Sequence, residues 1–98
     1  MKKNELTASD KRKLKQFSHN MGAYVIIGKN GVTHDTIKLL DKELERHEVV
    51  KIRCNKFKEQ RQEFAEDLAK KTKSAIINIV GNVIILYRES KDNTKHVL

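Results

Sequence analysis

The organisation of the chain follows from residues 23–31, whose sequence is AYVIIGKNG. Its first five residues are apolar and rich in β-branched side chains, which predicts a buried strand. Gly28 and Gly31 frame a turn, and Thr33 or Asp35 is expected to cap the helix that follows. The stretch therefore predicts a strand–turn–helix unit with its glycine turn at the end of the strand.

Upstream of this unit, residues 7–22 form a basic segment with helical periodicity. Thr7 is expected to cap this helix, with Asp10 three residues later as a loose form of the capping box. Gly22 is expected to end it. An apolar stripe is formed by Leu14, Phe17 and Met21, and it is surrounded by Lys11, Arg12, Lys13 and Lys15. Because the stripe is narrow and lacks Trp, packing against the domain is favoured over binding to a membrane.

Downstream, residues 49–54 alternate between apolar and polar positions, which predicts a half-exposed strand with Lys51 and Arg53 on its open face. A helix is expected at about residues 58–71. Strands are expected at 75–80 and 83–87, joined by a two-residue hairpin turn. The last strand is apolar on both faces, which predicts a central position in the sheet.

The resulting order α-β-α-β-α-β-β predicts an α/β fold, with a four-stranded mixed sheet covered by helices. Strand–helix–strand connections predict right-handed crossovers and parallel pairing, and the final hairpin adds one antiparallel strand. We expect residues 1–98 to form a single domain, with its core at 6–88 and a flexible tail at 89–98.

The composition favours a polyanionic partner. The 98 residues include 21 Lys or Arg and 13 Asp or Glu, which gives a net charge of +8. Such a charge attracts nucleic acid first, and then acidic proteins or anionic surfaces. No apolar run is long enough for a transmembrane helix, and the single Cys54 excludes an internal disulfide and fits a reducing compartment. We therefore expect a cytoplasmic monomer that does not bind membranes.

The charge is unevenly distributed along the chain. Residues 1–20 carry six Lys or Arg and two acids, and residues 49–62 carry five and one, so each block has a net charge of +4. Residues 35–48 carry three Lys or Arg against five acids, a net charge of −2. This acidic-leaning segment is interpreted as a solvated helix face, and the two basic blocks are the candidate contact surfaces.

The turn Gly28-Lys29-Asn30-Gly31 is the candidate binding site. Glycines let a backbone approach a ligand closely, and the start of the next helix offers N–H groups to phosphate. KH domains clamp a nucleic-acid backbone with a GxxG loop in the same physical way. His34 lies beside the turn and could contact phosphate. The spacing alone leaves a plain strand-to-helix turn equally open.

No motif of catalytic chemistry is found in the chain. The four histidines do not pair at metal-ligand spacing, and Cys54 has no CxxC partner. We therefore expect a non-catalytic binding module without a metal or another cofactor. A basic adaptor that docks acidic protein partners is the alternative to an RNA-binding protein.

Several segments in order resemble the YhbY family of CRM-domain proteins, across residues 6–88. They are Leu6-Thr7 before the basic helix and His19 near its end, then residues 25–33, 47–53 and 80–88. The resemblance implies an RNA-binding domain associated with pre-ribosomal large-subunit particles, and a fold similar to the C-terminal domain of translation initiation factor 3. Plastid relatives of the domain serve in group II intron splicing. Family members usually carry Pro before the first strand, where this chain has Gly22-Ala23.

By the same resemblance, the family's RNA-contacting loop falls on Gly28, Lys29, Asn30 and Gly31. The resulting hypothesis is a protein that binds large-subunit ribosomal RNA or pre-ribosomal particles. Lys29 and the N–H groups after Gly31 would hold phosphate. The contact would be extended by Lys11, Arg12, Lys13 and Lys15, and by Lys51 and Arg53 if their sheet face is open. Few aromatic residues favour recognition of backbone and shape over base stacking.

Overall fold

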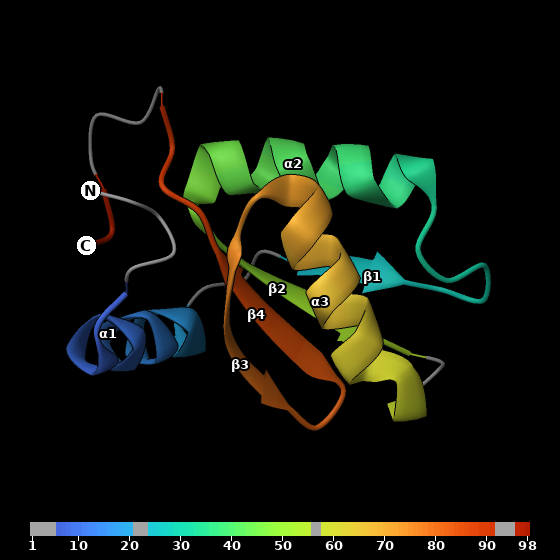
Figure 1. The fold of residues 1–98 in the computed structure, drawn as a ribbon, viewed down its shortest axis with the longest axis horizontal. Coiled ribbons are helices and arrows are strands. Elements are labelled where there is room, and N and C mark those ends of the chain that lie inside the picture. Colours follow the sequence, from blue (N-terminus) through green and yellow to red (C-terminus); the bar gives the residue numbers. More distant parts are fainter. Residues whose placement is uncertain (1–5, 21–23, 56–57, 92–95) are drawn as a thin grey trace.

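The computed structural model describes residues 6–20, 24–55, 58–91 and 96–98. The predicted order of elements is confirmed (Figure 1). The helices are α1 (Ala8–His19), α2 (His34–His47) and α3 (Arg61–Thr72), with a short 3₁₀ turn, η1 (Lys58–Gln60), before α3. The strands are β1 (Tyr24–Ile27), β2 (Val49–Cys54), β3 (Ala75–Val80) and β4 (Val83–Tyr87).

The four strands form one mixed sheet in the order β1-β2-β4-β3. β1 and β2 are parallel, as expected of strands joined through a helix. β4 lies inside the sheet, antiparallel to both β2 and β3, which confirms its predicted central position. Its apolar side chains are buried on both faces because helices cover both faces.

Two cores lie on opposite faces of the sheet. α2 and α3 cover the first face, and their Leu40, Leu44 and Leu68 pack with the β2 residues Val50 and Ile52. α1 covers part of the second face, where the buried residues are Leu14, Val49, Ile77, Ile85 and Tyr87. Figure 1 shows α1 on the opposite side of the sheet from α2 and α3. The fold is therefore a sheet between two helical layers, with the α1 layer covering only one end.

α1 begins with a complete capping box, because the Thr7 N–H donates to Asp10 Oδ2 and the Asp10 N–H donates to Thr7 Oγ1. The predicted apolar stripe is only partly correct. Leu14 is buried, but Phe17 is 43 % exposed, and Ser18 takes the buried position instead. The Ser18 hydroxyl is satisfied by donating to the Lys15 carbonyl at 2.7 Å. Met21 and Gly22, which the sequence assigned to the stripe and the helix end, lie outside the described residues.

The described parts of the tail, residues 89–91 and 96–98, pack against the domain where the sequence predicts a flexible end. Ser90 is buried, and Val97 packs against the second core beside Leu14. Glu48 is fully buried and accepts hydrogen bonds from the Ser90 N–H at 2.7 Å and the Val97 N–H at 2.9 Å. The tail is therefore held by an acidic side chain more than 40 positions earlier in the chain.

Candidate nucleic-acid interface

The turn after β1 has the geometry of a hydrogen-bonded β-turn. The Gly31 N–H donates to the Gly28 carbonyl at 3.1 Å, which closes the four-residue turn. Gly31 has a φ of 69°, in the left-handed region that favours glycine. Lys29 and Asn30 occupy the exposed centre of the turn. The backbone between the two glycines is thereby presented to solvent beyond the edge of the sheet.

The start of α2 lies directly after this turn, and Thr33 is its cap. Thr33 Oγ1 accepts from the Thr36 N–H at 3.2 Å and lies 3.0 Å from Thr36 Oγ1. Asp35 adds a negative charge to the first turn of the helix, and His34 is exposed beside it. The cap and Asp35 already serve part of the positive helix end, so less of it is left for an added anion.

The open face of β2 is partly covered by α1. Lys51 is half-buried and Arg53 is exposed. Arg53 pairs with Ile26 of β1, one residue before the end of that strand, so it lies at the same end of the sheet as the glycine turn. Lys51 and Arg53 alternate with buried residues of the first core and therefore face the α1 side.

The four cations of α1, which are Lys11, Arg12, Lys13 and Lys15, are all exposed. They do not lie beside the glycine turn. α1 packs over the start of β2 and the end of β4, whereas the turn follows the end of β1 (Figure 1). The longest dimension of the molecule is 35 Å, and Figure 1 shows α1 and the turn toward opposite ends of it. The predicted site residues thus fall into two groups on one molecule.

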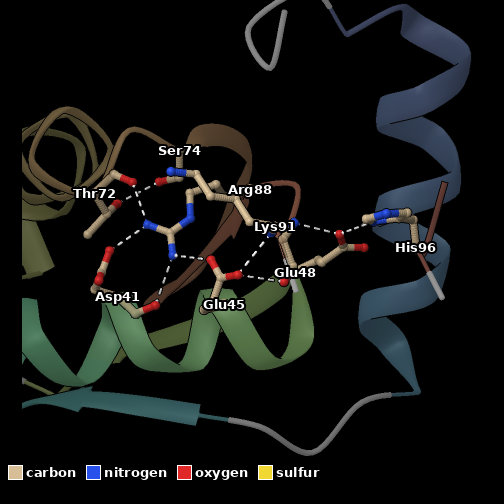
Figure 2. A network of polar contacts seen from close by, with 9 residues as sticks. Asp41, Glu45, Glu48, Thr72, Ser74, Arg88, Lys91 and His96 are labelled. Atoms are coloured by element: carbon tan, nitrogen blue, oxygen red, sulfur yellow. Dashed lines mark hydrogen bonds and ion pairs between the residues drawn. The ribbon is translucent and has the colours of Figure 1, made fainter. Parts of the chain in front are cut away.

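A buried cation, Arg88, joins α2 to the end of α3, and sequence reasoning gave it no role in the site. Its guanidinium donates to Asp41, to Glu45 and to the Thr72 carbonyl (Figure 2). Its side chain is 9 % exposed, so these bonds are made largely away from water. The available signal in the sequence was a basic residue directly after an apolar strand. Its two acidic partners lie more than 40 residues earlier in the chain, so no local pattern reveals them. Arg88 pairs with two carboxylates of α2 and offsets one of their two negative charges.

Glu48 and His96 form a second polar cluster next to Arg88 (Figure 2). His96 Nδ1 lies 2.6 Å from Glu48 Oε2. Burial alone would raise the pKa of Glu48, but hydrogen bonds from Ser90, His96 and Val97 outweigh burial and leave that pKa lowered. The hydrogen bond to Glu48 raises the pKa of His96. The pair therefore favours a charged carboxylate and a charged imidazolium.

Other chemistry finds little support among the described residues. No group of three His, Cys, Asp or Glu side chains there is arranged to hold a metal ion. Burial raises the pKa of the Cys54 thiol, which disfavours the thiolate that a nucleophile requires. In the same residues, no helix has both the length and the apolar character needed to cross a bilayer.

Comparison with known proteins places the chain in a family. The model of the CRS1/YhbY (CRM) domain matches residues 6–88, from the residue before the α1 cap to Arg88. The chain belongs to the CRS1/YhbY (CRM) domain family. The match includes the glycine turn, the cations of α1, the basic block at residues 49–62 and the arginine that joins the helices.

Relatives of this family cover nearly the whole chain. A Bacillus subtilis protein named "Probable RNA-binding protein YqeI" is 35 % identical over 89 residues, which is 90 % of this chain and 93 % of that protein. An RNA-binding protein of Haemophilus influenzae is 27 % identical over 88 residues, 89 % of each chain. The solution structure of the hypothetical protein SAV1595 from Staphylococcus aureus matches with a TM-score of 0.76 at 37 % identity, over 91 % of this chain and 94 % of that one.

Proposed function

We propose that this protein is a non-catalytic RNA-binding protein of the cytoplasm that acts as a monomer in assembly of the large ribosomal subunit. It contacts ribosomal RNA or pre-ribosomal particles through the backbone of the Gly28–Gly31 turn. Lys29, Asn30 and His34 surround this contact, and Arg53 adds to it from the neighbouring strand. The cations of α1 extend the attraction electrostatically over a longer RNA.

The observation that carries this proposal is the exposed, hydrogen-bonded glycine turn in a chain whose relatives are named as RNA-binding proteins. The turn offers backbone N–H and carbonyl groups together with a lysine, which suits a phosphate–sugar backbone better than a base edge. The net charge of +8 supplies the long-range attraction to a polyanion.

A substitution at Gly28 separates an RNA contact from a plain turn. A Cβ at this position would meet no atom within 4 Å, and the backbone φ lies outside the left-handed region. Gly28→Ala should therefore fold normally yet bind RNA severalfold more weakly, because the methyl group stands where RNA must approach. Filter binding to ribosomal RNA measures the affinity, and circular dichroism checks the fold. An unchanged affinity would leave the turn with a structural role only.

A specific surface favours a second candidate, a protein-interaction adaptor. Ile26, Arg53, Val83 and Val80 form one row across all four strands, on the end of the sheet that α1 leaves open. Ile26 and Val80 are each 57 % exposed. Apolar side chains exposed on one sheet face can contribute to a protein contact. Pull-down with and without ribonuclease distinguishes the candidates, because ribosomal particles are lost after RNA digestion only if RNA holds them.

A further inference from the structure

The basic side chains of α2 lie on one side of the helix although the segment is acidic overall. His34, Lys38, Lys42 and Arg46 recur at a spacing of four residues, which places them in one stripe along the helix. All four are exposed. The buried residues of the same helix, Leu40 and Leu44, point to the sheet. The stripe therefore faces outward, about 18 Å long from His34 to Arg46.

Three of the four acids of α2 already have cationic partners. Arg88 binds Asp41 and Glu45 from the α3 side of the helix. Glu43 lies 3.8 Å from Arg46 and 3.7 Å from His47. Asp35, in the first turn, is the acid left beside the stripe. The charge that α2 shows to solvent is thus more positive than its sequence count.

Lys38 and Lys42 are the cations at the centre of this stripe. Among the described residues, neither forms an ion pair, and both are exposed. Arg46 is partly offset by Glu43, so it contributes less. Two neighbouring ammonium groups, one helical turn apart and without acidic partners, attract an extended anion.

The stripe begins at the glycine turn. α2 starts three residues after Gly31, and Figure 1 shows the helix running from the turn across the molecule, on the face opposite α1. An RNA strand on the turn can continue along α2 without crossing the sheet. To reach the cations of α1, the same strand must pass to the other face and the other end of the molecule.

We propose that the outward side of α2, centred on Lys38 and Lys42, is a phosphate-binding track that continues from the Gly28–Gly31 turn. The track takes the phosphate backbone of an RNA strand and reads no base. This inference rests on the proposed function, because it takes RNA as the ligand, and it adds a surface on which a short RNA is held.

The test compares two matched pairs of substitutions. Lys38→Gln/Lys42→Gln on α2 and Lys11→Gln/Lys15→Gln on α1 each remove two exposed charges at the same helical spacing. Both variants and the wild type are titrated with a labelled, mixed-sequence RNA of about ten nucleotides, a length in the range of single-strand binding sites. Salt dependence is measured for each, and circular dichroism confirms folding.

The α2 pair should bind this RNA about five- to tenfold more weakly, with the log–log salt slope reduced in magnitude by about two. The α1 pair should weaken the binding of this short RNA by a smaller factor than the α2 pair, because it removes the same charge at the other end of the molecule from the turn. Equal losses in both pairs would overturn the track, because only total charge would then matter. Unchanged binding by the α2 pair, with Gly28→Ala still weakened, would overturn the track alone. Failure of the wild type to bind any RNA would overturn the proposed function itself.

Discussion

At the scale of single residues, the two glycines of the turn have different physical roles. Gly31 adopts a φ of 69°, a backbone conformation that costs free energy for a residue with a Cβ. Glycine at this position therefore stabilises the turn itself. Gly28 has no such requirement, and open space surrounds the position of a Cβ. A substitution at Gly31 therefore changes conformation and site together, whereas one at Gly28 changes the site.

Gly31→Asp should lower RNA affinity more than Gly31→Asn. Asn and Asp both tolerate the left-handed conformation, so the pair differs mainly in the carboxylate beside the start of α2. The negative charge would repel phosphate where the helix end otherwise attracts it. Lys29→Ala removes a single exposed charge and should cost less than Gly31→Asp. Filter binding ranks the three variants, and equal affinities of the Asp and Asn variants would contradict an anion site here.

Arg88 is a polar residue whose loss should weaken the fold. Its partners Asp41, Glu45 and the Thr72 carbonyl would be left without the buried cation. Arg88→Met should therefore lower the free energy of unfolding by about 3 kcal/mol, as expected when one partner of a buried pair is removed. Arg46→Met, on an exposed residue of α2, is the control and should cost less than about 0.5 kcal/mol. Urea unfolding that gives both variants the same midpoint would contradict this role of Arg88.

At the scale of elements, α1 packs one side against the sheet and presents cations to solvent on its other side. Replacing Lys11, Arg12, Lys13 and Lys15 by Gln should leave the fold intact, because all four are exposed. Affinity for long ribosomal RNA should fall, and its salt slope should become shallower by about 0.7 to 0.9 for each of these cations that meets a phosphate. A folded quadruple variant that binds long RNA as tightly as wild type would show that α1 faces away from it.

The tail contact should depend on pH through His96 and Glu48. Glu48 raises the pKa of His96 above 6.5, and Glu89 adds to the effect. The stability that His96 contributes is therefore complete below about pH 6.5 and is lost as the pH rises through the pKa of His96 in the folded protein. The pKa of Glu48 is lowered, so the stability that Glu48 contributes is present at neutral pH and is lost only as the pH falls below 4.5.

The urea midpoint should accordingly decrease as the pH rises above about 6.5, and His96→Gln should remove most of that decrease. The variant's midpoint should approach that of the wild type once the pH exceeds the raised pKa of His96, since the wild-type imidazole is then neutral. An identical pH profile for the two proteins would contradict a charged His96 on Glu48.

The elements themselves could be predicted because their signals are local. Thr7 and Thr33 mark helix starts, and alternation along residues 49–54 marks a strand. The misassigned Phe17 shows the limit of such patterns, since an apolar residue on a helix becomes buried only if something covers it. The tail was misjudged for a related reason, because Glu48 binds it from a distance in sequence that no local pattern reveals.

At the scale of the whole molecule, the sequence could suggest which residues form the candidate site but not how the fold arranges them in space. The glycine turn and its exposure follow from residues 28–31 alone. The separation of α1 from the turn depends on which end of the sheet each helix covers, which is a tertiary property. Counting charge along residues 35–48 also concealed the basic stripe of α2, because three of the four acids of α2 are bound by Arg88 and by neighbours on the helix.

The salt dependence of wild-type binding to ribosomal RNA tests the central claim, contact with the RNA backbone, most directly. With about four to six phosphates neutralised, the logarithm of the binding constant should fall against the logarithm of the salt concentration with a slope of roughly −3 to −5. A net charge of +8 and few stacking aromatics motivate this expectation. A slope near zero would contradict it, because binding would then rest on contacts other than phosphate.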